Sequence, residues 1–286
     1  MLKLILFVAL VSVFLQAQAN QNLRFESTHE IKSKVLEEQR TYYVYLPPSY
    51  HSSNNRYPVI YVLDGDMHRF KAISGMLEGL STDTLEKQVQ EAIVVAIPNS
   101  ENAIRERDLT PTNIKQWTFK DKVLQEFDGD IGNANKYISF FSNELIPEIN
   151  KTYRTSSKRV LIGESFGGLF AAYALISEPS TFSDYLIIDP TSLWDNNYLN
   201  KAIAKARFSS LELSADVFIG FANNAALGDI GLTNLAWGRE FYTNLSMNKS
   251  EQFNVKEQYF EQETHGTVAL LSWYHGLRYL LASNDN

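Results

Sequence analysis

Short apolar segments alternate with longer amphipathic ones along most of the chain. The compact segments are rich in β-branched and aromatic residues, which is typical of buried strands. They cover residues 57–63, 92–97, 159–163, 184–189, 216–221 and 254–260. The longer stretches predict helices over residues 68–90, 136–151, 168–177, 196–206, 233–245 and 267–282. Two further segments, 23–33 and 40–46, predict a pair of antiparallel strands near the start.

Strands that alternate with helices predict an α/β fold. We expect a mostly parallel, eight-stranded sheet with helices on both faces. No internal repeat and no long Pro/Gly/Ser linker divides the chain, so residues 20–286 are predicted to form one domain. In such sheets ligands bind beyond the carboxyl ends of the strands, and the functional site is expected there.

Residues 99–135 interrupt the alternation. The segment carries arginines, lysines and Trp117 without a helical period, between a predicted strand and the next predicted helix. A long insertion at this edge of a sheet is either a plain surface loop or a loop that covers the substrate.

The first 19 residues have the pattern of a secretory signal peptide. A short basic start is followed by an apolar stretch over residues 4–15 and an A-x-A site that ends at Ala19. The apolar stretch is shorter than the roughly 20 residues that a membrane anchor needs. We therefore predict export to the periplasm or the medium, with no stable membrane anchor. The chain has no cysteine, so the exported protein would have no disulfides.

The charge balance excludes some partners. The formal net charge is −7, and it becomes −8 when Lys3, the only charged residue before Asn20, leaves with the signal peptide. An acidic chain argues against nucleic acid as the main partner. No H-E-x-x-H, cysteine cluster or G-x-x-x-x-G-K-[ST] is present, so neither a metal nor an organic cofactor is predicted.

A G-x-S-x-G pattern lies where the strand over 159–163 meets the helix over 168–177. It reads Gly163-Glu164-Ser165-Phe166-Gly167. A sharp turn between strand and helix exposes the serine hydroxyl, and the flanking glycines let the strand and the helix approach. We predict Ser165 as a nucleophile; the alternative is a serine that only caps the helix.

A serine nucleophile needs a base, normally a histidine. His265 follows the last predicted strand and precedes the last helix, which is where a base is expected in chain order. His68 is the rival, although a substrate contact suits it better. An oxyanion hole needs two N–H donors. We predict the amides of Phe166, the residue after the serine, and of Asp66, in the turn after the strand over 57–63.

The acid that would orient His265 is the weakest element of the pattern. It is expected after the strand over 216–221, and Asp229 is the next carboxylate along the chain. Glu263 is close to His265 in sequence but would emerge from the same strand end. A serine–histidine dyad, with an asparagine or a backbone carbonyl holding the imidazole, is an open alternative.

Several stretches together resemble the esterase D-like branch of the α/β-hydrolases, which includes bacterial siderophore trilactone esterases. The similar stretches, in the family's order, are residues 57–66, 105–111, 163–170, 189–194 and 264–267. The resemblance implies the α/β-hydrolase fold, Ser165 as nucleophile, His265 as base and the Asp66 amide in the oxyanion hole. It also implies that Arg105 and Arg107 line or shape the substrate side.

Two positions depart from the family pattern. Glu164 stands where many relatives have histidine, and Asn223 or Asn224 occupies the usual acidic position. The expected function is an exported serine hydrolase that cleaves a small-molecule carboxylic ester, such as a siderophore-type lactone or an acyl ester. The alternatives are an acyltransferase of the same fold, as the related mycolyltransferases are, and a non-catalytic ligand-binding protein on a hydrolase scaffold.

Overall fold

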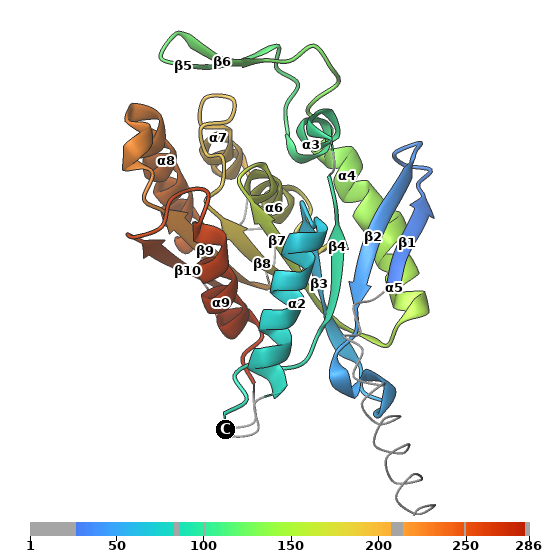
Figure 1. Ribbon diagram of the computed structural model, residues 1–286. Coiled ribbons are helices and arrows are strands. Elements are labelled where there is room, and N and C mark those ends of the chain that lie inside the picture. Colours follow the sequence, from blue (N-terminus) through green and yellow to red (C-terminus); the bar gives the residue numbers. More distant parts are fainter. Residues whose placement is uncertain (1–26, 83–85, 100, 207–213, 249, 284–286) are drawn as a thin grey trace, which may run out of the picture.

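A mostly parallel sheet of eight strands organises the part of the chain that the structure describes (Figure 1). This computed structural model describes residues 27–82, 86–99, 101–206, 214–248 and 250–283. The strand order is β1-β2-β4-β3-β7-β8-β9-β10. Within this sheet the pairs β1–β2 and β2–β4 are antiparallel, and the other pairs are parallel. The predicted fold class is confirmed, and so is the antiparallel pair at the start. The predicted signal peptide over residues 1–19 lies outside the described residues.

The strands correspond closely to the apolar segments of the sequence. Their bounds are β1 Ser27–Lys32, β2 Gln39–Tyr45, β3 Tyr57–Leu63, β4 Ile93–Ile97, β7 Thr155–Glu164, β8 Asp184–Ile188, β9 Ala215–Ala222 and β10 Phe253–Phe260. Every residue of β3, β4 and β8 is buried, because these parallel strands are covered on both faces.

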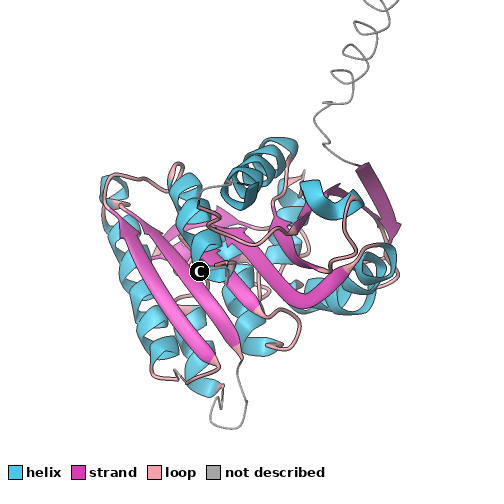
Figure 2. Cartoon of the chain, turned by 90° about the horizontal axis from the view of Figure 1, so that it is seen from below, coloured by secondary structure: helices cyan, strands magenta, loops and turns pink. Residues whose placement is uncertain are grey.

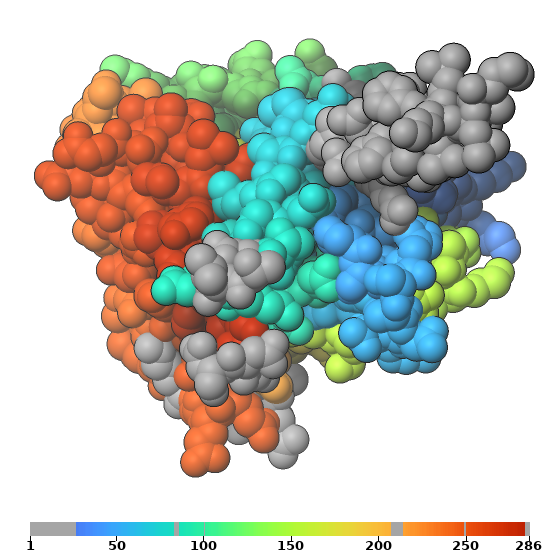
Figure 3. Space-filling view, turned by 60° about the horizontal axis from the view of Figure 1, so that its bottom comes forward, coloured from blue at the N-terminus to red at the C-terminus, as the bar shows by residue number. Residues whose placement is uncertain are grey.

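Helices cover the two faces of the sheet, as the view from below shows (Figure 2). One face carries α2 (Met67–Thr82) and α9 (Val268–Leu280), which lie side by side (Figure 3). The other face carries α4 (Ala134–Phe140), η2 (Phe141–Leu145), α5 (Ile146–Thr152), α6 (Phe166–Ser177), α7 (Tyr198–Lys205) and α8 (Asp229–Ser246). The short helices η1 (Pro48–His51) and η4 (Ala225–Leu227) lie in connections.

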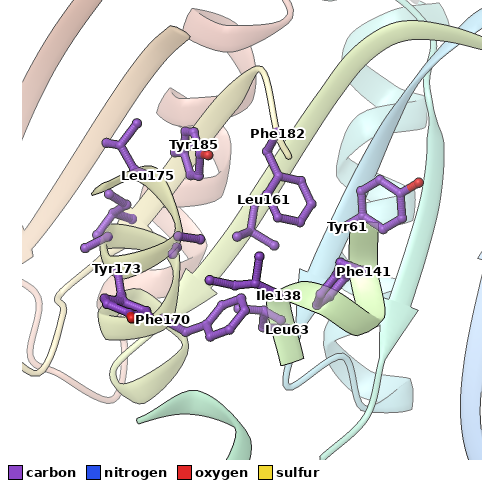
Figure 4. Close-up of a cluster of buried hydrophobic side chains, with 14 of the residues drawn as sticks. Tyr61, Leu63, Ile138, Phe141, Leu161, Phe170, Tyr173, Leu175, Phe182 and Tyr185 are labelled. Atoms are coloured by element: carbon purple, nitrogen blue, oxygen red, sulfur yellow. The ribbon is translucent and has the colours of Figure 1, made fainter. Parts of the chain in front are cut away.

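Alternate residues of each strand enter one of two hydrophobic cores. Tyr61 and Leu63 of β3 pack into the core under α6, together with Phe141 and Phe170 (Figure 4). Their neighbours Ile60 and Val62 point to the core under α2 and α9. Neighbouring positions on a strand therefore support opposite layers of helices, which holds the ends of the strands in place.

The segment over residues 99–135 has more structure than its sequence predicts. It contains the helix α3 (Asn102–Leu109) and a separate antiparallel hairpin of β5 (Gln116–Phe119) and β6 (Lys122–Glu126). The expectation of no helix there is wrong. Ion pairs with distant residues hold α3: Asp108 is buried against Arg40 of β2, and Arg107 binds Glu38. A local sequence pattern does not contain such contacts.

The hairpin β5–β6 extends across the carboxyl edge of the sheet toward α8 (Figure 1). At its base the Trp117 ring packs against Phe166 and Trp194, with centroid distances of 6.0 and 5.8 Å. At its tip Lys120 Nζ lies 2.7 Å from an Asp229 carboxylate oxygen on α8. The hairpin therefore contacts the residue that follows Ser165, so it is not a plain surface loop.

Two predicted helices have different ends in the structure. The helix expected over 68–90 stops at Thr82, and the one expected over 136–151 consists of α4, η2 and α5 in succession.

None of the helices in the described part of the chain is long and apolar enough to span a membrane.

Candidate active site

The turn from β7 into α6 holds Ser165 in a strained conformation. Its backbone has φ +59° and ψ −117°, a region that few non-glycine residues adopt. A Cβ on Gly163 would lie 2.1 Å from the Gly167 carbonyl oxygen, so only glycine allows the strand and the helix to come this close. Ser165 begins the helix but makes no capping hydrogen bond with its side chain. The Ser165 hydroxyl therefore does not cap the helix and is available to other side chains.

His265 is the histidine whose ring reaches this hydroxyl. Its Nε2 lies 3.1 Å from Ser165 Oγ. The imidazole lies between β10 and α9 and is 41% exposed. The Thr191 hydroxyl lies 3.4 Å from the serine oxygen. His68, the rival base in the sequence, is exposed at the start of α2. The two residues with the strongest sequence signal are thus brought together from positions 100 apart in the chain.

The carboxylate that contacts His265 is Asp189, which the sequence analysis did not select. Its Oδ2 lies 2.5 Å from His265 Nδ1, and its side chain is fully buried. Asp189 comes directly after β8 and has a backbone φ of +37°. The Asn224 side-chain amide donates to Oδ2 at 2.7 Å, and the Ala222 amide donates to Oδ1 at 3.3 Å. The carboxylate is therefore oriented from two sides.

Asp229, the predicted acid, does not contact His265. It is the first residue of α8, its side chain is 71% exposed, and it pairs with Lys120 of the hairpin. The prediction is corrected to Asp189, because β8 lies between β7 and β9 and ends beside the serine turn. Asn224, one of the two asparagines at the usual acidic position, contacts His265 through the backbone: its Oδ1 accepts a hydrogen bond from the His265 amide at 3.1 Å. The sequence signal that could have found this carboxylate is the position of Asp189 in residues 189–194, a stretch that resembles the family.

Asp189 also changes the acidity of the histidine. The hydrogen bond that His265 donates to Asp189 raises the pKa of His265 above its usual value, and this effect exceeds the lowering by burial. The nearby charges act in opposite directions: Glu164 raises the pKa and Arg105 lowers it. The imidazolium form is therefore stabilised, which suits a group that must hold a proton during part of a reaction.

The two predicted oxyanion donors differ in their availability. Phe166 is the first residue of α6, so its amide has no carbonyl one turn earlier in that helix to which it could donate. The Asp66 amide, in contrast, donates to the Asp64 carbonyl at 2.8 Å. The Phe166 amide thus has no acceptor within its own helix, whereas the Asp66 amide is hydrogen-bonded within its own turn.

Arg105 and Arg107, both implied as substrate-side residues, have different surroundings. Arg105 Nε lies 3.0 Å from both carboxylate oxygens of Asp64, and its guanidinium carbon lies 5.1 Å from the Phe166 ring centroid. Arg105 therefore lies next to the serine turn. Arg107 binds Glu38 at 2.7 Å and Asp108 at 2.8 Å, which fixes α3 to the β1–β2 side. The ion pairs give Arg107 a structural role, and its implied part in lining or shaping the substrate side stays a prediction.

A further ion pair lies beside the serine and was not predicted. Glu164, immediately before Ser165, binds Arg69 of α2 at 3.0 Å.

Among the described residues, no group of three or more acidic or histidine side chains is placed to hold a metal ion.

Comparison with known proteins decides the family. The model of the putative esterase family matches residues 33–267, which is most of the chain. The chain belongs to the putative esterase family.

One curated relative is similar to this chain over part of its length. Ferri-bacillibactin esterase BesA of Bacillus subtilis (strain 168) is 28% identical over 177 residues, which are 57% of this chain and 58% of BesA. The chain thus matches less than two thirds of that curated relative.

Two solved structures of similar fold cover more of the chain. An IroE-like serine hydrolase from Shewanella oneidensis has a TM-score of 0.78 and 29% identity, over 90% of this chain and 80% of the other. The BES protein from Bacillus cereus has a TM-score of 0.74 at 23% identity, over 90% and 96% of the two chains, and supports the fold alone.

Proposed function

We propose that this esterase-family protein hydrolyses carboxylic esters through an acyl-enzyme on Ser165. The observation that supports it most is the His265 imidazole, which bridges the Ser165 hydroxyl at 3.1 Å and the buried Asp189 carboxylate at 2.5 Å. The proposed nucleophile is thus hydrogen-bonded to the base, and the base to the orienting acid, which is the arrangement that activates a serine.

Each group has one task in the proposed reaction. His265 Nε2 takes the hydroxyl proton as Ser165 Oγ bonds to the ester carbonyl carbon, and it then gives that proton to the departing alcohol oxygen. In the second step water gives a proton to the same nitrogen as its oxygen bonds to the acyl carbon. The bond from Ser165 Oγ to the acyl carbon then breaks, Ser165 takes that proton back from His265, and the carboxylic acid leaves. Asp189 keeps the proton on Nδ1, so that Nε2 can accept the serine proton.

The negative charge that develops on the carbonyl oxygen needs donors. The Phe166 amide, at the start of α6, is the proposed first donor, and the helix dipole there adds favourable potential. The Asp66 amide is the proposed second donor, and it must leave the Asp64 carbonyl to act. Arg105 beside Phe166 is proposed to contact the substrate.

The relative BesA is named as a ferri-bacillibactin esterase, and for this reason we propose a siderophore-type lactone as one candidate substrate beside simple acyl esters. The test is a panel of aryl esters of increasing chain length and a catecholate trilactone, given to the purified protein. Labelling of Ser165 by a fluorophosphonate, located by peptide mass spectrometry, checks the nucleophile independently of the substrate. No hydrolysis and no labelling would contradict the proposal.

We expect the rate of ester cleavage to rise with pH across neutrality. His265 must be neutral to accept the serine proton, and Asp189 raises its pKa above the ordinary 6.5. The expected result is a kcat/KM for an aryl ester that reaches half of its plateau above pH 6.5. A pH profile measured at constant ionic strength checks this, and a midpoint below 6.5 would contradict it.

A further inference from the structure

The turn after β3 is held rigidly at one end and carries two acidic residues. Asp64 has a backbone φ of +49° and is buried. Gly65 is wedged against β4: its amide donates to the Ile97 carbonyl at 2.9 Å, and a Cβ there would lie 2.7 Å from Ala96 Cβ. The Gly65 end of the turn is thus fixed to the sheet.

The Asp66 amide is the part of this turn that must change. Its bond to the Asp64 carbonyl spans only three residues, and the small ring bends such a hydrogen bond away from linearity. If the amide swings toward an oxyanion, the carbonyl of a buried residue loses this donor. A buried carbonyl without a partner is unfavourable, so the movement needs a second donor at the same oxygen.

Arg69 supplies that second donor. Its Nη1 lies 3.3 Å from the Asp64 carbonyl oxygen, while its Nη2 donates to Glu164 at 3.0 Å. Glu164 is only 14% exposed and precedes the serine directly. One planar guanidinium therefore joins the serine turn to the turn of the second oxyanion donor.

Arg105 holds the same turn from its other side, through the Asp64 carboxylate. The carbonyl and the carboxylate of Asp64 are thus bound by different arginines. Because Arg105 also lies against Phe166, both sides of the serine turn are connected to Asp64. Only the Arg69 contact lies at the oxygen that the Asp66 amide would leave.

We propose that Arg69 is a positioning residue of the oxyanion hole: it satisfies the Asp64 carbonyl when the Asp66 amide turns from that carbonyl to the oxyanion. The inference rests on the proposed esterase function and deepens it. Arg69 itself touches no reacting atom. Its contribution appears only in the transition state, when the Asp66 amide has moved, so it affects kcat and leaves KM almost unchanged.

The test compares Arg69→Met, Arg69→Lys and a control, Lys71→Met, which removes an exposed cation from the same helix. The ester is an aryl acetate, and active sites are counted by fluorophosphonate titration. Arg69→Met is expected to lower kcat per titrated site by between about 10-fold and 100-fold, somewhat less than the loss of an oxyanion donor itself. Lysine cannot reach both acceptors at once, so Arg69→Lys should lose at least about fivefold. Lys71→Met should match the wild type.

A second readout separates positioning from simple support of the fold. A phenylboronic acid, which forms a tetrahedral adduct on the serine, should lose affinity in proportion to kcat, while KM stays within about twofold. If both Arg69 variants keep kcat per site within about twofold of the wild type, the inference is overturned and the esterase function stands. If Arg69→Met does not fold, Arg69→Lys decides by the same criterion. If the wild-type protein cleaves no ester, the proposed function fails and the inference fails with it.

Discussion

Replacing Ser165 by alanine is expected to lower kcat for ester cleavage by about 10⁶-fold, the order of loss that follows removal of a serine nucleophile from a triad. Ser165 Oγ is the atom that would bond to the acyl carbon, and His265 Nε2 is hydrogen-bonded to it at 3.1 Å. Alanine leaves no atom that can form the acyl-enzyme. What remains is the rate that bound water achieves in a site with oxyanion donors.

The fold should tolerate this substitution. Serine and alanine both lack the freedom of glycine at a φ of +59°, so the strain of the turn is similar in both proteins. The measurements are kcat/KM with an aryl ester, the thermal midpoint and fluorophosphonate labelling. Ser177→Ala, the same change at the other end of α6, is the matched control and should keep full activity. Hydrolysis that persists in purified Ser165→Ala protein would assign the nucleophile elsewhere.

Asp189→Asn is expected to lower kcat by about 10⁴-fold, as in other triads in which the acid becomes an amide. Both oxygens of Asp189 accept hydrogen bonds, Oδ2 from Asn224 and His265 and Oδ1 from Ala222. An asparagine must place its NH₂ group against one of these donors. If it faces His265, the proton moves to Nε2, which then cannot accept a proton from Ser165. In the other orientation the asparagine NH₂ group faces the Ala222 amide, and two donors then meet without an acceptor.

The same substitution should also shift the pH profile. Since the hydrogen bond to Asp189 raises the pKa of His265, its loss is expected to move the midpoint of kcat/KM to lower pH. Measuring the residual activity from pH 5 to 9 checks this sign. An unchanged midpoint would mean that another group sets the acidity of the histidine.

Asp229→Asn is the matched control for the acid. Its carboxylate is exposed and paired with an equally exposed lysine, and such surface pairs contribute little. We expect kcat within about twofold of the wild type. The reverse outcome, with Asp229→Asn inactive and Asp189→Asn active, would restore the assignment made from chain order.

Much of the architecture follows from local patterns. Strands buried on both faces read as continuous apolar runs, and β3, β4 and β8 were all found in this way. The helix α3 was missed because its residues have little hydrophobic periodicity, and it is held by pairs such as Arg107–Glu38, which join residues 69 positions apart. The helix predicted to reach residue 90 ends at Thr82, and Gln90 donates to the Leu281 carbonyl instead, a distant contact that no local pattern contains.

By itself the sequence determined which serine and which histidine are the candidate nucleophile and base, because both have local signals. Gly163, two residues before Ser165, is required by a close strand–helix contact, and His265 follows the last strand of an α/β sheet. The tertiary structure decided which carboxylate contacts that histidine. Parallel strands end at one edge, but the order of strands in the sheet determines which ends are neighbours. Only that order, together with the positive φ of Asp189, brings its carboxylate to a histidine 76 residues further along the chain.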